Sequence, residues 1–199
     1  MKVSEARPSG RACRGELPLL TRGLPTQIFV NTALDQMNRF SREQAEAEFL
    51  KCCGSRNWAR EMSEARPFAS IDDLLAKAES VWSSLSEEDW LEAFRAHPKI
   101  GEKKAAAAQS DQARNWSVQE QSGTEDAAAE TKAALAAGNQ EYERRFGFIF
   151  IVCATGKSSG EMLAILNERL QNDPDTELRI AAEEQRKITR LRLEKLLNR

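Results

Sequence analysis

The chain of 199 residues has one histidine and four cysteines, which are too few for an ordinary zinc site. The cysteines form no Cys-x-x-Cys pair, so the simplest interpretation is free thiols in a reducing compartment. No run of about 18 apolar residues occurs, which excludes a helix that spans a membrane. The 29 basic and 31 acidic residues lack the basic excess of a nucleic-acid-binding protein. These absences predict a cytoplasmic protein that binds no metal, no membrane and no nucleic acid.

Residues 1–30 differ in composition from the rest of the chain. They are rich in arginine, proline and glycine, show no periodicity, and contain no apolar segment long enough for a secretory signal. We predict a disordered N-terminal extension over 1–30. We predict a single folded domain over 31–199, which is long enough to bury a hydrophobic core.

From about residue 31 onward, the apolar residues recur with the period of an α-helix. Ser41 and Gln44 have the spacing of a capping box, and Gly54 marks the end of the helix that they begin. Pro67 and Pro98 each follow a helical segment. The segments predicted to be helical are 41–54, 57–67, 70–85, 86–98, 101–109, 117–147 and 176–198, with 117–147 forming either one helix or two that meet near Gly123.

One segment breaks this pattern, "FGFIFIVCATGKSSGEM" at residues 146–162. Its first half is aromatic and β-branched, which is typical of a buried strand, but no other strand is predicted to pair with it. A helix restarts after Ser158, where Ser158 and Glu161 form a second capping box. The Gly-Lys-Ser sequence before it is not a phosphate-binding loop, because Ile151 occupies the position of the motif's first glycine. The predicted fold is an all-α, single-domain helical bundle with one buried extended segment near 146–155.

The only histidine, His97, lies in "FRAHPKIGEKK" directly before Pro98. In the last turn of a helix, a histidine interacts favourably with the helix dipole, and this structural role is one interpretation. The other is catalytic. Imidazole has an ordinary pKa near neutrality, and Pro98 restrains the chain beside it, as a general base requires.

Glu120 lies in "SVQEQSG" and also has two interpretations. Ser117 and Glu120 have capping-box spacing, which would make Glu120 a helix cap. Alternatively, Glu120 meets His97 across a pocket, where each side chain would shift the pKa of the other. The four tryptophans are expected in the core or in a pocket wall. The charged C-terminal helix is expected to present a solvated face.

Several of these stretches together resemble one family, the 2-oxo-4-hydroxy-4-carboxy-5-ureidoimidazoline (OHCU) decarboxylases of urate breakdown, and in particular its bacterial members. The matching stretches occur in the family order over roughly residues 31–198, and they are "NWAREMSEARPF", "FRAHPKIGEKKA", "SVQEQSG", "FGFIFIVCATGKSSGEML" and "EQRKITRLRLEKLL". The resemblance implies an all-α homodimeric carboxy-lyase without a cofactor. Such an enzyme converts its small-molecule substrate to (S)-allantoin, the last step of urate-to-allantoin conversion in purine catabolism.

The resemblance also implies roles for individual residues. His97 and Glu120 match the family's catalytic histidine and glutamate, and Pro98 matches a proline that shapes the pocket. The substrate-lining stretch corresponds to Phe150, Ile151, Val152, Ala154 and Thr155. Many members have an arginine at the position of Thr155. In its place, Lys157, the helix N-terminus near Ser158 or another cation would supply the charge, or the affinity for substrate is lower.

Two other functions remain open from the sequence. One is an enzyme of the same fold that acts on a related ureido-imidazoline, with Thr155 marking the altered specificity. The other is a helical interaction module without enzymatic activity, in which His97 and Glu120 are structural and tolerate substitution. The second predicts no concave pocket around His97.

Overall fold

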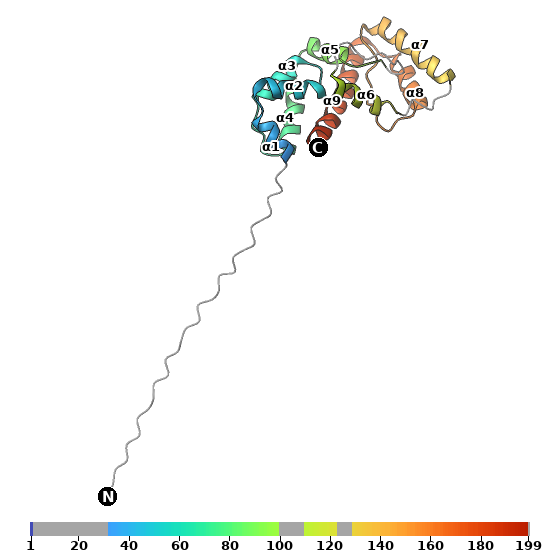
Figure 1. The fold of residues 1–199 in the computed structure, drawn as a ribbon. Coiled ribbons are helices and arrows are strands. Elements are labelled where there is room, and N and C mark those ends of the chain that lie inside the picture. The colour runs from blue at the N-terminus through green and yellow to red at the C-terminus, as the bar shows by residue number, and fades with distance from the viewer. Residues whose placement is uncertain (2–31, 100–109, 123–128, 199) are drawn as a thin grey trace. The chain divides into compact units, whose positions relative to one another are not determined.

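A computed structural model describes Met1 and residues 32–99, 110–122 and 129–198. Over these ranges the chain forms nine helices and no strand (Figure 1). The helices are α1 (Thr32–Arg39), α2 (Arg42–Cys52), α3 (Arg56–Glu64), α4 (Ile71–Ser84), α5 (Glu87–Arg95), α6 (Asp111–Glu120), α7 (Ala129–Phe146), α8 (Ser159–Arg169) and α9 (Pro174–Leu197). The predicted all-α fold is confirmed. The extension predicted over 1–30 and the helix predicted over 101–109 lie outside the described residues, apart from Met1.

Serine side chains begin most of the helices. A serine hydroxyl accepts a hydrogen bond from a first-turn amide that has no partner within the helix. Two of the predicted capping boxes form, at Ser41–Gln44 and Ser158–Glu161. Among the described residues, the N-caps with such bonds are Ser41, Ser55, Ser70, Ser86, Ser110, Ser158 and Asp173. These local contacts explain why most helix starts are readable from the sequence.

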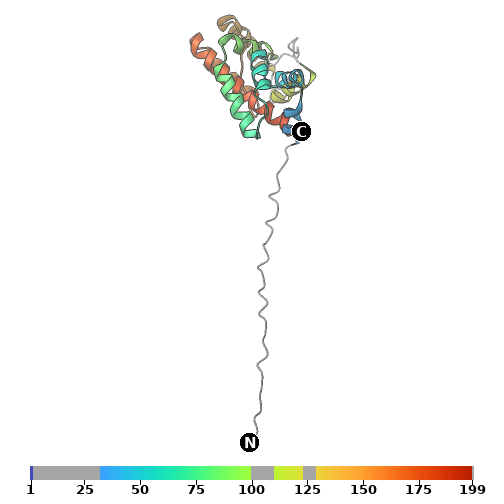
Figure 2. The same cartoon turned by 90° about the vertical axis from the view of Figure 1, so that its left-hand side faces the viewer.

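Most of the other helices pack against α9. It contacts α1, α2, α4, α5 and α7, and it runs beside α4 in Figures 1 and 2. Ala181, Ile188 and Leu196 are buried on it, as the apolar period predicts, whereas Leu178 and Leu191 are only partly buried. Helices α7 and α8 pack on each other, and their C-terminal ends lie together, since Arg169 Nη2 donates to the Tyr142 hydroxyl at 3.2 Å.

Of the two alternatives predicted for 117–147, one helix or two, the structure has two, α6 and α7, and the first begins earlier than predicted. Helix α6 starts at Asp111 with Ser110 as its N-cap and ends at Glu120. Helix α7 starts at Ala129, and Gly123 lies outside the described residues between them. Ser110 before Asp111 is a sequence signal for the true start of this helix. The Ser-x-x-Glu spacing at 117–120 is a competing signal, and it gave the wrong start.

Gly54 follows the end of α2 for a reason that the sequence did not show. The last helical residue is Cys52, and Gly54 does not adopt a positive φ. A Cβ atom at Gly54 would lie 2.2 Å from the Cβ of Ala96, the residue before His97. The glycine therefore permits close contact between the end of α2 and the end of α5.

The segment after α7 is buried and contains neither helix nor strand, as predicted. Gly147, with φ of 78°, ends α7, and residues 150–154 are all buried. Arg169, at the end of α8, donates from Nη1 to the Ile151 carbonyl at 2.8 Å and lies 4.8 Å from the centre of the Phe150 ring. Its charge is balanced by buried Glu177, whose Oε1 accepts from Arg169 Nη2 at 2.5 Å. Arg169 thus provides the hydrogen bond that a neighbouring strand would otherwise give to the Ile151 carbonyl.

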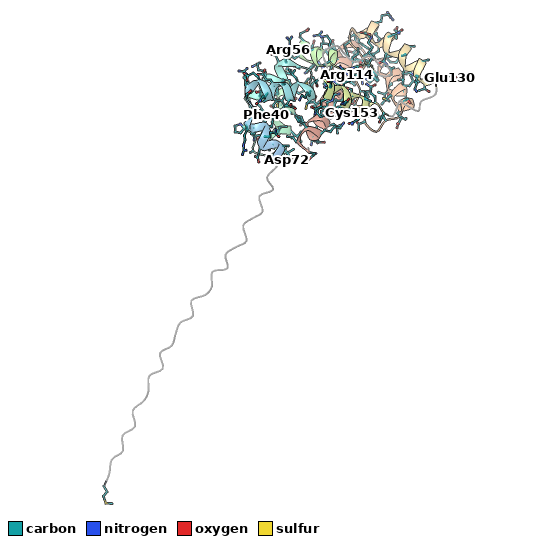
Figure 3. The ribbon with its side chains drawn as sticks, in the orientation of Figure 1. Phe40, Arg56, Asp72, Arg114, Glu130 and Cys153 are labelled. Atoms are coloured by element: carbon teal, nitrogen blue, oxygen red, sulfur yellow. The ribbon has the colours of Figure 1, made fainter. Side chains whose placement is uncertain are left out.

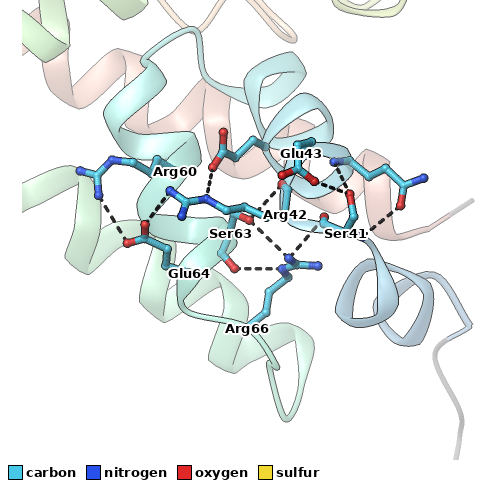
Figure 4. Close-up of polar contacts among 9 residues, drawn as sticks. Ser41, Arg42, Glu43, Arg60, Ser63, Glu64 and Arg66 are labelled. Atoms are coloured by element: carbon cyan, nitrogen blue, oxygen red, sulfur yellow. Dashed lines mark hydrogen bonds and ion pairs between the residues drawn. The ribbon is translucent and has the colours of Figure 1, made fainter.

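Arg66 likewise donates hydrogen bonds to backbone carbonyl groups, in this case near the end of α1. Arg66 donates to the carbonyls of Met37 at 2.9 Å and Phe40 at 2.6 Å, at the end of α1. Figure 4 shows this side chain beside the ion pair between Arg42 and Glu64, which links α2 to α3. These contacts fix the N-terminal helices to one another.

The tryptophans and cysteines occupy the predicted kinds of environment. Trp58, Trp82 and Trp116 are buried, and Trp90 is partly buried against the core. In the described part of the chain, Cys52, Cys53 and Cys153 are buried free thiols. None of the described helices is both long enough and apolar enough to cross a membrane.

Candidate active site

His97 lies just beyond the end of α5, not in its last turn as predicted. The helix ends at Arg95 with Ala96 as its C-cap, and the His97 amide donates to the Phe94 carbonyl at 3.0 Å. After Pro98, the side chain of Lys99 forms an ion pair with Glu143 of α7, with Nζ and Oε2 2.6 Å apart. His97 is therefore positioned by a helix end on one side and by a tethered segment on the other.

Glu120 is the last residue of α6, and it is buried against Arg192 of α9. Arg192 donates from Nε to Glu120 Oε1 at 3.0 Å and from Nη2 to Oε2 at 2.7 Å. Nη2 also donates to the Ser117 hydroxyl at 3.0 Å. Only 3% of the Arg192 side chain is exposed, so the pair is largely shielded from water. Two-point contact fixes the plane of the carboxylate as well as its charge.

The predicted capping box at Ser117 and Glu120 is wrong. Both residues lie in the C-terminal part of α6, where the Ser117 hydroxyl donates to the Ala113 carbonyl at 3.0 Å. Ser110 caps the helix instead. Glu120 therefore does not serve as a helix cap, and its observed partner is the buried guanidinium of Arg192.

Arg192 and Gln185 are site residues that the sequence interpretation missed, because the C-terminal helix was expected to present a solvated charged face. Both are buried. A signal was available: they lie at helical spacing with Ala181, Ile188 and Leu196, which places them on the apolar stripe of α9. A polar side chain on such a stripe must find a buried partner.

All eight residues predicted for the site line one cavity. The eight predicted residues are His97, Pro98, Glu120, Phe150, Ile151, Val152, Ala154 and Thr155. The cavity is also lined by Ser117, Gln121 and Ile188. The free volume among them is about 20 Å³, room for roughly one water molecule, so a ring-sized ligand must displace part of the lining. The geometry brings these residues together, and their catalytic and binding roles remain predictions.

The surroundings of His97 favour a neutral imidazole. Burial lowers the pKa of His97 from 6.5 to about 3, and the nearby positive charge of Arg192 acts in the same direction. Gln185 lies against the ring and raises the pKa. The Nε2 atom of Gln185 donates to Thr189 Oγ1 at 3.2 Å, whereas its buried Oε1 makes no well-formed hydrogen bond to the described residues. At neutral pH, His97 is therefore uncharged and has an unprotonated ring nitrogen.

This lowered pKa predicts a loss of stability in mild acid. Below about pH 6.5 the unfolded chain binds a proton at His97 that the folded chain does not, so the free energy of unfolding falls as the pH falls. Between pH 6.5 and 5, wild type should lose up to about 1.4 kcal/mol per pH unit more than His97→Gln. Urea unfolding over this range measures the difference. Because the chain has one histidine, parallel curves for the two proteins would show that His97 titrates normally in the fold.

Thr155 supplies no positive charge, and the structure shows where each group suggested to supply it instead is located. Thr155 is exposed at the edge of the cavity. Lys157 donates from Nζ to the Cys153 carbonyl at 2.7 Å, which directs its charge to the backbone. The N-terminus of α8 carries its own capping box, with the Glu161 carboxylate at the end that would bind an anion. Arg192 is a buried cation beside the cavity, where it pairs with Glu120.

A wider cavity of about 460 Å³ lies near α2, α5 and α6 and contains none of the eight predicted residues. Arg192 contributes to its lining, together with Lys51, Arg56 and Arg95. Each of these cations pairs with a carboxylate. The pairs are Arg192–Glu120, Lys51–Glu48, Arg56–Glu92 and Arg95–Glu88. In the described part of the chain, the cations that line the wider cavity are therefore all paired with carboxylates.

No group of three or more His, Cys, Asp or Glu side chains that could hold a metal occurs among the described residues. The polar groups at the narrow cavity include an imidazole, a carboxylate paired with a guanidinium, the hydroxyls of Ser117 and Thr155, the amide of Gln121 and the backbone of an extended segment. Together they can accept a proton and orient a polar planar ligand by hydrogen bonds.

Comparison with known proteins agrees with this arrangement. The family described as OHCU decarboxylase matches residues 38–194. Over 160 residues the chain is 45% identical to the Arabidopsis thaliana protein "Uric acid degradation bifunctional protein TTL", which covers 78% of this chain and 48% of that protein. It is 35% identical to the Amia calva 2-oxo-4-hydroxy-4-carboxy-5-ureidoimidazoline decarboxylase, over 66% of this chain and 75% of that protein. The chain thus spans about half the length of the plant relative.

A solved structure shares the fold. It is described as "Crystal structure of OHCU decarboxylase in the presence of (S)-allantoin" and has a TM-score of 0.66 and 38% sequence identity to this chain. The match covers 76% of this chain and 98% of that one. The similarity therefore extends over the helices that carry the narrow cavity.

Proposed function

The chain belongs to the OHCU decarboxylase family, and from this membership we propose that it decarboxylates 2-oxo-4-hydroxy-4-carboxy-5-ureidoimidazoline to (S)-allantoin. The observation that carries the proposal is the convergence of His97, Glu120 and the buried segment 150–155 on one cavity. These residues come from parts of the chain that are far apart in sequence. A non-enzymatic helical module gives no reason for them to meet.

The substrate carries a hydroxyl and a carboxylate on one ring carbon, beside a carbon that is double-bonded to a ring nitrogen. When the bond to the carboxylate carbon breaks, CO₂ leaves and its electron pair moves into the neighbouring C=N group. The ring nitrogen of that group takes up a proton. The hydroxyl loses its proton as its carbon becomes a carbonyl, and the adjacent carbon gains a proton. The substrate supplies its own electron sink, so we propose that the reaction uses no cofactor.

His97 is proposed as the group that accepts the hydroxyl proton. It is neutral at physiological pH, because burial and Arg192 hold its pKa low, and a neutral imidazole has a free acceptor nitrogen. The helix end before it and Pro98 after it limit its movement. Such a positioned base contributes typically about 10²–10⁴ in rate.

Glu120 is proposed to hold a ring N–H group or the hydroxyl of the substrate. Arg192 fixes its carboxylate at two points, at 2.7 and 3.0 Å, and so sets the direction of its remaining lone pairs. Pro98, Phe150, Ile151, Val152, Ala154 and Thr155 are proposed as the substrate-binding wall. We further propose a cytoplasmic homodimer, which the family resemblance supports.

The test is circular dichroism during allantoin formation. Urate is converted in situ by urate oxidase and hydroxyisourate hydrolase, and this protein is then added. Spontaneous decay yields racemic product and no lasting signal, so a rapidly growing signal of one sign is the expected result.

A flat trace from folded protein would contradict the proposal. The same assay on related ureido-imidazolines then tests the second candidate, which Thr155 favours because it provides no charge where many relatives have an arginine. If no substrate of this class reacts, an interaction module becomes the better interpretation.

A further inference from the structure

Both backbone polar groups of Cys153 are held by charged side chains. The Cys153 amide donates to Glu184 Oε2 of α9 at 2.7 Å. The Cys153 carbonyl accepts from Lys157 Nζ, also at 2.7 Å. Cys153, labelled in Figure 3, is buried. An extended segment without a neighbouring strand must find such partners elsewhere, and bonds to charged groups are the stronger kind.

The two residues that flank Cys153 belong to the narrow cavity. Val152 and Ala154 line it together with His97 and Glu120, whereas Cys153 itself does not. In an extended chain, successive residues direct their polar groups to opposite sides. Holding Cys153 from outside the cavity therefore sets where the backbone of its two neighbours stands relative to His97.

Each of the two charged residues is itself fixed in place. Glu184 Oε1 accepts from Lys187 at 2.5 Å, so the two carboxylate oxygens of Glu184 have separate partners. Lys157 follows a tight turn in which its amide donates to the Ala154 carbonyl at 3.0 Å, and Gly156 has a φ of 78° there. The turn directs the lysine side chain back toward Cys153. The contacts are therefore part of the fold, not chance encounters of long side chains.

We propose that Glu184 and Lys157 are positioning residues of the active site, which hold the backbone of Cys153 so that Val152 and Ala154 keep their place opposite His97. The inference rests on the proposed decarboxylase activity. Neither residue lines the cavity, so their effect is transmitted through the backbone of the wall.

The chain offers a matched control in Lys187. Glu184→Ala removes the bond to the Cys153 amide, whereas Lys187→Ala removes the other partner of Glu184 and leaves that bond in place. We expect Glu184→Ala to raise KM and to lower kcat/KM by about tenfold or more, because small displacements of substrate-contacting groups have large effects. Lys187→Ala should have a much smaller effect, because the bond between Glu184 and the Cys153 amide remains. Glu184→Gln, which keeps an acceptor oxygen, should recover much of the loss.

The split between KM and kcat separates positioning from mere stability. A partly unfolded enzyme contains fewer active molecules, which lowers the apparent kcat without changing KM. Lys157→Met tests the same contact from the other side and should also raise KM. Hydrogen exchange of the Cys153 amide gives a readout independent of activity, and we expect faster exchange in Glu184→Ala than in Lys187→Ala.

The outcomes are distinguishable. If wild type forms (S)-allantoin but Glu184→Ala and Lys157→Met keep the wild-type KM, the inference is wrong and the proposed function stands. If wild type itself forms no allantoin, the proposed function is wrong. Hydrogen exchange then decides whether Glu184 holds the wall: unchanged exchange in Glu184→Ala overturns the inference, and faster exchange supports it.

Discussion

His97→Asn is expected to lower kcat/KM for (S)-allantoin formation by about 10²–10⁴ while the protein stays folded. Asparagine is polar and of similar size, but its amide cannot accept a proton at neutral pH. The substrate hydroxyl would then have to lose its proton to water. The measurement is the initial rate of the circular dichroism signal, with the far-ultraviolet spectrum as the check on folding.

Lys99→Gln provides the control for this substitution. Lys99 lies two positions further along the same segment and pairs with Glu143, and it does not line the narrow cavity. Its replacement should lower turnover far less than His97→Asn does, because the imidazole is retained and only a partly exposed ion pair is lost. Full activity in a folded His97→Asn protein would refute the proposed role of His97, since no second histidine exists to replace it.

Arg192→Met is expected to lower the free energy of unfolding by about 3–5 kcal/mol, because it leaves the carboxylate of Glu120 buried without its main partner. Lys195 Nζ lies 3.9 Å from Glu120 Oε1, too far to replace two hydrogen bonds. Activity should fall as well, since the carboxylate loses its fixed orientation. Urea unfolding measures the stability, and the circular dichroism assay measures the rate.

The matched control is Arg190→Met on the same helix. Arg190 also pairs with carboxylates, those of Glu79 and Glu194, but its side chain is 49% exposed. Exposed pairs contribute at most about 1 kcal/mol, so this variant should be nearly as stable as wild type. Adding Glu120→Gln to Arg192→Met removes the uncompensated charge and should recover part of the loss. Equal stability of Arg190→Met and Arg192→Met would show that burial of the ion pair does not matter.

Local signals carried most of the fold prediction, and the errors arose where two local signals competed. Ser41 and Ser158 were recognised as helix starts because a cap depends on residues only three positions apart. The same spacing misled at Ser117 and Glu120, because a Ser-x-x-Glu sequence also fits inside a helix that has already begun. Ser110 is the actual cap, and the spacing rule by itself does not choose between the two.

The sequence by itself determined the helices that begin at Ser41 and Ser158 and the buried extended segment between α7 and α8. It also supplied, through family resemblance, eight residues that prove to line one cavity. Only the tertiary structure decided what holds those residues. The pairs Glu120–Arg192 and Cys153–Glu184 join positions 72 and 31 residues apart. Such contacts depend on how α9 packs against α6 and against the extended segment. Burial holds these charged side chains of α9 against their partners. Neither helix caps nor hydrophobic periodicity specifies which charged residues will be in contact.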